Sequence, residues 1–235
     1  MARKSKARPS ARTTSSRSES SPRDKIVGAF MELLAEKSFE SIGLAEIAER
    51  AGVSLADLRG EFGSTLSILA GHIKDIDRQV LAGVNADMAE ESPRERLFDV
   101  MMRRLELLAP YREAARSLMR TAKRNPALAL AFNGMTVRSQ QWMLAAAGIT
   151  AAGPKGMLRA QGLAVIFASV LRTWVDDEDE GLAKTLAALD RELARGQRFS
   201  GLLDELCKLP ERACQFTRRA RGSRRGRDRD EAVAT

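Results

Sequence analysis

The sequence predicts an all-α protein, and three observations lead to that fold class. The 235 residues are rich in Ala, Leu, Arg and Glu, while aromatic residues make up 5% of the chain, and this composition favours helix. Apolar residues recur three and four positions apart in successive segments, which is the period of an amphipathic helix. Several segments begin with a Ser that precedes an acidic residue by three positions, a pattern typical of helix starts. The sequence has no strand-like alternation and no Gly-rich phosphate loop.

The first predicted helix begins after Ser21 and ends near Lys37. Ser21 is a good N-cap, Pro22 suits the first helical position, and Asp24 follows the cap by three residues. The apolar stripe of this helix consists of Ile26, Val27, Phe30, Leu33 and Leu34. We therefore expect one face of the helix to be buried.

The stretch LAEIAERAGVSLADLRGEF, from Leu44 to Phe62, predicts two short helices joined by a tight turn. Gly52 supplies the left-handed backbone conformation that such a sharp stop needs. Ser54 caps the second helix, and Asp57 lies at the third position after the cap, so its charge is partly explained as capping chemistry. Ser64 caps a longer helix that follows. A pair of short helices of this kind usually places the second one in a DNA groove.

The rest of the chain also predicts helices. Ser92 repeats the capping pattern with Glu95, Pro110 ends that helix, and the pair Asn125–Pro126 ends the next. The predicted helical segments are residues 91–110, 111–124, 127–148, 157–177 and 177–196, with a last apolar segment from 199 to about 219.

Five consecutive acidic residues, Asp176 to Glu180, lie at the start of the fifth of these segments. Carboxylates at the start of a helix complement its dipole. Paired carboxylates also perform acid–base catalysis or bind Ca²⁺, but the spacing of a calcium loop is absent here. We therefore expect this run to cap and start a helix.

The net charge of +8 is concentrated at the two ends of the chain. Residues 1–18 hold six Arg and Lys and no acid, and residues 218–235 hold seven Arg against three acids. The remaining 26 basic and 28 acidic residues nearly cancel. Both basic segments have almost nothing to bury, so we expect disorder there. They serve either as solubilising tails or as sequence-independent attractors of phosphate and anionic lipid.

The sequence offers little for catalysis. His72 is the only histidine, and Cys207 and Cys214 are seven positions apart, too far for a disulfide on one helix. No metal-ligand spacing and no convergent nucleophile and base appear in the sequence. No apolar signal segment and no apolar run of about 18 residues is present. We expect a soluble, cytoplasmic protein that is not an enzyme and needs no metal or cofactor.

The N-terminal part of the chain resembles the TetR family of bacterial regulators. The likeness runs from about Ser21 to Leu81, and its most specific motif is IAERAGVS, from Ile47 to Ser54. The resemblance implies a homodimer that binds a double-stranded DNA operator and responds to a small apolar ligand. It implies an N-terminal three-helix, helix-turn-helix DNA-binding domain and a larger helical domain for ligand binding and dimerisation.

The resemblance also sets the expected domain bounds. A basic arm occupies residues 1–20, the DNA-binding domain 21–82, the ligand and dimerisation domain 83–217, and a basic tail 218–235. The late helices, around 157–175 and 182–193, offer apolar faces that either form the dimer interface or are used within the monomer core.

The DNA-contacting positions follow from the same resemblance. They are Gly43, Ser54, Leu55, Ala56, Asp57, Arg59, Gly60, Glu61, Ser64 and Thr65. The chain departs from the family at three of them, since members usually have Tyr at the position of Arg59, His or Tyr at Glu61, and Lys at Thr65. Arg59 is able to bond guanine, and Glu61 either accepts from cytosine or faces solvent. Two interpretations stay open: a working DNA reader, or the fold retained without DNA binding.

The second half of the chain resembles the lipid-binding accessory protein of ubiquinone biosynthesis. The likeness covers about Pro93 to Arg195, and its best motif is TWVDDEDEGLAKTLAALDREL. It implies the alternative function, a non-enzymatic protein with a TetR-like fold that binds apolar lipid or quinone and no longer reads DNA. The last apolar segment, 199–216, is then either a docked helix or a helix in weak contact with a membrane surface.

Eight apolar residues are candidates for lining a ligand pocket. They are Phe98, Met101, Met102, Met119, Trp142, Met143, Phe167 and Trp174. Flexible methionines with two tryptophans suit an apolar cavity, although such residues at helical spacing are also ordinary core. The interpretation we favour is a ligand-responsive transcriptional regulator, most often a repressor.

Overall fold

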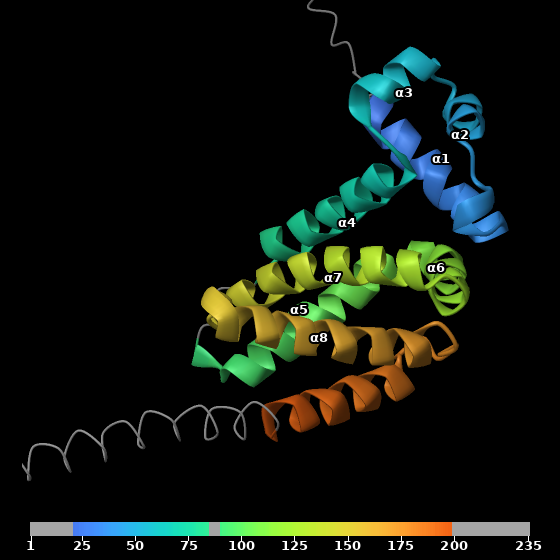
Figure 1. Cartoon of the computed structure of the whole chain (residues 1–235). Helices are drawn as coiled ribbons and strands as arrows, with labels where there is room; N and C mark the ends of the chain where they lie inside the picture. The colour runs from blue at the N-terminus through green and yellow to red at the C-terminus, as the bar shows by residue number, and fades with distance from the viewer. Residues whose placement is uncertain (1–20, 85–89, 199–235) are drawn as a thin grey trace, which may run out of the picture.

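The regular secondary structure is helical throughout the residues that the computed structural model describes, 21–84 and 90–198 (Figure 1). The N-terminal part contains α1 (Pro22–Glu36), η1 (Phe39–Ser41), α2 (Leu44–Ala51), α3 (Leu55–Glu61) and α4 (Thr65–Ala82). The chain continues with α5 (Pro93–Leu108), η3 (Ala109–Tyr111), α6 (Arg112–Arg124), α7 (Pro126–Ala146) and α8 (Gly153–Trp174). A last described helix covers residues 183–198. The predicted all-α fold class is confirmed.

Some sequence-based expectations fall outside these ranges. The basic segments 1–20 and 218–235, the two cysteines and the apolar segment 199–216 lie outside the described residues. The expectations about them therefore stay predictions.

The four helix starts predicted after a serine are confirmed by their caps. The hydroxyl oxygens of Ser21, Ser54 and Ser92 accept from the backbone N–H three residues later, at 3.1, 3.0 and 3.3 Å. The cap at Ser64 accepts from the Ser67 N–H at 3.2 Å. Each such cap stabilises its helix by about 1 kcal/mol.

The acidic run also caps a helix, as predicted. The Asp177 carboxylate is buried and accepts from the Thr185 backbone N–H at 2.9 Å and from its hydroxyl at 2.7 Å. The Asp179 carboxylate accepts from the Ala183 N–H at 3.1 Å. The hydrogen bonds from Thr185 lower the pKa of Asp177, and the bond from the Thr185 hydroxyl contributes most.

The described residues form two hydrophobic cores that share α4. The first core joins α1, α2, α3 and the start of α4, and the second joins the end of α4 with α5, α7, α8 and the last described helix. On α4, Ile68 and Leu69 belong to the first core, while Ile76 and Val80 belong to the second. One continuous helix is therefore packed in both cores.

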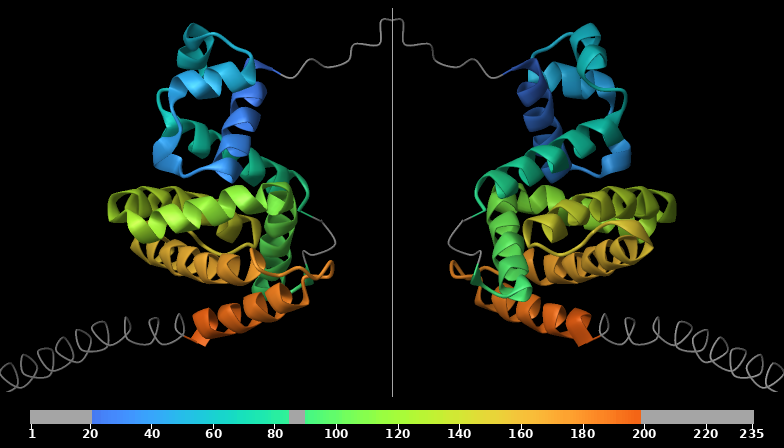
Figure 2. Two further views of the ribbon diagram at one scale, coloured as in Figure 1. Left: turned by 90° about the vertical axis from the view of Figure 1, so that its right-hand side faces the viewer. Right: turned by 90° about the vertical axis from the view of Figure 1, so that its left-hand side faces the viewer.

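The N-terminal helices also rest on α6 and α7. The Ser117 hydroxyl on α6 donates to the Lys37 carbonyl at 2.8 Å, and the rings of Phe39 and Phe132 meet edge to face with centroids 5.4 Å apart. In both views of Figure 2 the helices α1–α3 lie at one end of the molecule and the last described helix, in orange, lies at the other. The short helices α2 and α3 are therefore presented at one end of the molecule.

Candidate functional site

The turn between α2 and α3 is built around one glycine. Gly52 has φ 64°, in the left-handed region that side chains other than glycine adopt at a cost. Its N–H donates to the Glu49 carbonyl at 3.1 Å, and the Val53 N–H donates to the Ala48 carbonyl at 3.0 Å. These bonds end α2 within one residue and set the angle at which α3 begins.

Asp57 serves as part of the cap of α3. Its carboxylate accepts from the Ser54 hydroxyl at 2.7 Å and from the Ser54 backbone N–H at 3.2 Å. These hydrogen bonds lower the pKa of Asp57 below its ordinary value, and the bond from the Ser54 hydroxyl contributes most. The charge of Asp57 is thus held at the first turn of α3, where it also complements the helix dipole.

The predicted DNA-contacting residues lie on the surface of the molecule. All ten are exposed except Thr65, which is half-buried. On the inner face of α3, Leu58 is 2% exposed, and Phe62, the residue that follows the helix, is also buried. On the outer face Leu55 is 56% exposed, an unusual exposure for a large apolar side chain at a helix start.

Arg59 and Glu61 extend from the same short helix without partners of opposite charge among the described residues. The Arg59 guanidinium lies beside Gly63, since a Cβ added to that glycine would lie 3.4 Å from Arg59 Nη1. A free guanidinium is able to bond guanine in two places, a carboxylate accepts from cytosine, and the apolar tip of Leu55 suits the methyl group of thymine. The outer face of α3 therefore carries groups with three different base preferences.

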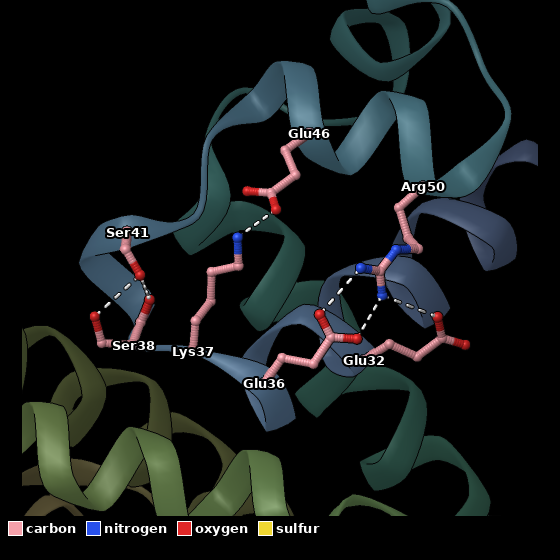
Figure 3. Close-up of polar contacts among 7 residues, drawn as sticks. All are labelled: Glu32, Glu36, Lys37, Ser38, Ser41, Glu46 and Arg50. Carbon is pink, nitrogen blue, oxygen red and sulfur yellow. Dashed lines mark hydrogen bonds and ion pairs between the residues drawn. The ribbon is translucent and has the colours of Figure 1, made fainter.

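Ionic contacts attach α2 to the end of α1 (Figure 3). The Arg50 guanidinium donates to both carboxylate oxygens of Glu36, at 2.7 and 3.0 Å, and Glu32 lies farther off at 3.8 Å. Lys37 forms a second link to Glu46. The hydrogen bond from Arg50 lowers the pKa of Glu36, and the bond to Glu36 raises the pKa of Arg50. These pairs were not predicted from the sequence, although the sequence shows the basic and acidic residues that form them.

A second set of contacts attaches the end of α3 to α4. Arg23 on α1 lies between the two. It pairs with Asp75 on α4 at 2.6 Å, and its guanidinium lies 5.7 Å from the centroid of the ring of Phe62, the residue that follows α3. Gly71 on α4 lies against the same ring, since a Cβ added there would approach Phe62 Cε1 to 2.9 Å. The position of α3 thus depends on close approach between α4 and Phe62, a contact that no local pattern in the sequence predicts.

A buried ionic network joins α4 to α5 and α7. Arg104 Nη1 donates to Asp77 at 2.8 Å, and the Ser139 hydroxyl donates to the same carboxylate at 2.7 Å. The Arg104 guanidinium also lies 4.9 Å from the centroid of the Phe167 ring on α8. Burial lowers the pKa of Arg104, and the Asp77 charge opposes that effect. A buried pair of this kind is costly to separate, so it ties α4 to the helices beneath it.

The predicted pocket residues are mostly packed in the second core. Met101, Met143, Phe167 and Trp174 are buried, and Phe98, Met102 and Met119 are partly buried against them. Trp142 differs, because its side chain is 57% exposed. Helical spacing identifies the apolar face of a helix but does not tell a packed face from one that borders a cavity.

Among the eight residues, Trp142 alone lines either of two grooves found in the described part of the chain. The first, of about 690 Å³, runs between the start of α5, α8 and the last described helix. Its walls are apolar and include Leu158, Val165 and Leu193. The second, of about 620 Å³, lies between α4 and α7 and is bordered by Trp142.

Among the described helices, none combines the length and the apolar character that crossing a bilayer requires. Nor does any cluster of three or more His, Cys, Asp or Glu side chains suited to a metal ion occur within residues 21–84 and 90–198.

Comparison with known proteins identifies similar structures. No family model and no curated protein matches the chain. A TetR transcriptional regulator from Nitrosomonas europaea ATCC 19718 is 25% identical with a TM-score of 0.58, covering 74% of this chain and 97% of that one. A TetR transcriptional regulator from Rhodococcus sp. RHA1 is 23% identical with a TM-score of 0.50, covering 73% and 96%. A putative TetR-family regulator from Syntrophomonas wolfei is 16% identical with a TM-score of 0.54, covering 76% and 94%.

These neighbours have the fold described above, a helical N-terminal helix-turn-helix domain followed by a helical C-terminal domain. They are transcriptional regulators and not enzymes. They lend no support to the likeness between the second half of this chain and the lipid-binding accessory protein of ubiquinone biosynthesis.

Proposed function

We propose that the protein is a ligand-responsive DNA-binding transcriptional regulator that acts as a repressor. The observation that carries the proposal is the outer face of α3, which is capped, attached to its neighbours through Phe62 and Arg23, and exposed with Arg59 unpaired among the described residues. The fold shared with TetR regulators supports the same conclusion.

DNA recognition rests on α3 in the major groove. Arg59 reads guanine, Glu61 accepts from cytosine and Leu55 contacts thymine methyl groups. Gly43, Ser64 and Thr65 lie at the ends of the neighbouring helices, where backbone N–H groups and hydroxyls are able to contact phosphates. Ser54, Ala56, Asp57 and Gly60 complete the surface that approaches the duplex.

The active form is a homodimer. On α8, Met157, Leu158 and Val165 are 55%, 52% and 59% exposed, and two of them border the apolar groove beside the last described helix. A second copy that packs its own α8 on this surface would remove these side chains from water. Two copies of α3 then face successive major grooves of a near-palindromic operator, about 34 Å apart.

Ligand response is proposed to act through α4. This helix is packed in both cores and is held to α5 and α7 by the Asp77–Arg104 pair. A small ligand with an apolar body, bound in the C-terminal domain, would change the spacing of the two reading heads if it binds one dimer conformation more tightly. Gln140 on α7 is fully buried and neither atom of its amide has a hydrogen-bond partner among the described residues, a polar position that a ligand would satisfy.

The basic segments at the two ends contribute attraction to DNA that does not depend on sequence. The apolar segment 199–216, which is followed by arginines, would add weak contact with a membrane surface. Both proposals predict binding that falls with rising salt, whereas base readout adds selectivity at any one salt concentration.

Selection from a pool of random duplexes tests the proposed function. We expect the full-length chain to enrich one near-palindromic motif, and a shortened chain of residues 20–218 to enrich the same motif with lower affinity. If neither chain enriches a motif and only the full-length chain retains duplexes, DNA reading has been lost. Apolar lipid extracted from the purified protein would then favour the alternative, a lipid- or quinone-binding protein.

A further inference from the structure

The groove between α4 and α7 has an apolar wall on each side. Ile73 and Leu81 line it from α4, and Met135 and Trp142 line it from α7. The Trp142 side chain is 57% exposed at this groove. An exposed tryptophan beside a methionine offers a broad, polarisable surface against which a planar apolar group packs well. At about 620 Å³ the groove has the size of a small-molecule site.

Three cations surround this apolar surface. Lys74 and Arg78 lie on α4 and Arg138 on α7, all three exposed and all three lining the groove. Arg78 has an acidic neighbour, Asp75, at 3.9 Å. For Lys74 and Arg138, residues 21–84 and 90–198 provide no hydrogen-bonding or ionic partner. Two of the three positive charges are therefore available to a ligand.

The carboxylate that lines the groove does not cancel these charges. Asp77 is 6% exposed and is already paired with Arg104 at 2.8 Å, while the Ser139 hydroxyl donates to it at 2.7 Å. Its negative charge is matched from the interior side by a guanidinium that is itself buried. The open side of the groove therefore presents an excess of positive charge over an apolar surface.

We propose that this groove binds a small amphipathic anion, an aromatic ring system that bears one carboxylate or sulfonate group. The ring system packs between Trp142 and Ile73, and the anionic group is bound by Lys74 and Arg138 from the two sides of the groove. Charge-assisted hydrogen bonds of this kind are about twice as strong as neutral ones. An uncharged apolar molecule of the same shape leaves both cations without a partner and binds more weakly.

The position of the groove gives binding a consequence for DNA. Its wall includes Gly71, which lies against Phe62 at the end of α3, so a ligand that bridges α4 and α7 acts on the helix that holds the reading head. This consequence rests on the proposed function, whereas binding itself does not.

A matched pair of fluorescent probes tests the inference without DNA. Anilinonaphthalene sulfonate carries one sulfonate, and phenylnaphthylamine is the same ring system without it. We expect the full-length protein to bind the sulfonate at least about tenfold more tightly, the ratio that one charge-assisted hydrogen bond supplies. Quenching of tryptophan emission by the bound sulfonate is expected to be reduced in Trp142→Phe.

Paired substitutions locate the site. Lys74→Gln/Arg138→Gln is expected to weaken sulfonate binding about tenfold and to leave phenylnaphthylamine unchanged, while Trp142→Ala weakens both probes. The control Arg120→Gln/Arg124→Gln removes the same charge from exposed positions on α6 and should leave both affinities unchanged. Equal affinity for the two probes, or equal losses in the two double variants, would overturn the inference. If the protein selects an operator but does not prefer the sulfonate probe, only the groove inference is refuted. If it prefers the sulfonate probe but selects no operator, only DNA reading is refuted.

Discussion

His72 shows how burial of a single side chain sets a pH dependence. It lies on α4, 4% exposed, with its ring 4.4 Å from the Tyr111 ring, centroid to centroid. Burial lowers its pKa from 6.5 to about 4, the Arg104 charge acts in the same direction, and the Asp75 charge opposes them. The imidazole is therefore neutral in the folded protein at neutral pH.

The lowered pKa of His72 predicts a loss of stability in mild acid. The unfolded chain takes up a proton near pH 6.5, whereas the folded chain does so only near pH 4, so stability falls as the pH drops between these values. The full difference amounts to about 3 kcal/mol. Urea unfolding at about pH 7.5 and about pH 5 should show roughly 2 kcal/mol of it, because pH 5 is still above the folded pKa, and His72→Gln should remove most of that change. An equal loss in wild type and variant would show that other groups cause the effect.

Serine caps and tryptophan burial show what could and what could not be predicted from the sequence at the level of single residues. The caps at Ser21, Ser54 and Ser92 were predictable because donor and acceptor are three residues apart. Trp142 and Trp174 received the same prediction, but one is 57% exposed beside a groove and the other is fully buried. The difference depends on which helices pack against each position, and no local pattern encodes that.

At the scale of elements, two glycines in helix interiors predict opposite effects of the same substitution. A Cβ at Gly71 on α4 would approach Phe62 Cε1 to 2.9 Å, whereas a Cβ at Gly28 on α1 meets nothing within 4 Å. We expect Gly71→Ala to lower the free energy of unfolding by about 1–3 kcal/mol through overpacking. Gly28→Ala should raise it by up to about 1 kcal/mol because alanine favours helix.

Thermal unfolding of the two glycine variants provides the comparison. Because Phe62 follows α3 directly, Gly71→Ala is also expected to weaken binding to the selected operator, while Gly28→Ala leaves that binding unchanged. Destabilisation of equal size in both variants would contradict the close approach between α4 and Phe62.

The order of the helices and the ends marked by a serine cap or a proline could be predicted, but their contacts could not. Two starts differ from the prediction: α8 begins at Gly153 and not at 157, and the last described helix begins at 183 and not at 177. The spacing of apolar residues and the position of Pro110 located α5 and its end. The pairs Arg23–Asp75 and Arg104–Asp77 join positions far apart in the sequence, and many other charged residues would have been equally plausible partners. Long-range pairing is decided by packing of the helices, which the pattern within one helix does not specify.

At the scale of the whole molecule, the exposed face of α8 predicts a dimer. Leu158 and Val165 lie seven residues apart, two helical turns, and both are more than half exposed. We expect Leu158→Glu/Val165→Glu to be a monomer in sedimentation equilibrium and to lose most of its operator affinity, since one copy contacts only one half-site. Leu130, 73% exposed on α7, is the matched control, and Leu130→Glu should remain a dimer. A wild-type protein that sediments as a monomer bound to its operator would contradict the proposed assembly.

DNA reading by α3 is the central claim, and its most direct test is the affinity of the full-length protein for two duplexes of equal length. One carries the selected operator and the other the same bases in scrambled order. We expect wild type to prefer the operator by at least about 10³-fold, and Arg59→Ala to lose roughly tenfold to a hundredfold on the operator with little change on the scrambled duplex. Arg120→Ala, which removes an exposed arginine on α6, should behave as wild type. If all three proteins bind both duplexes equally at every salt concentration, the chain does not read DNA through this helix.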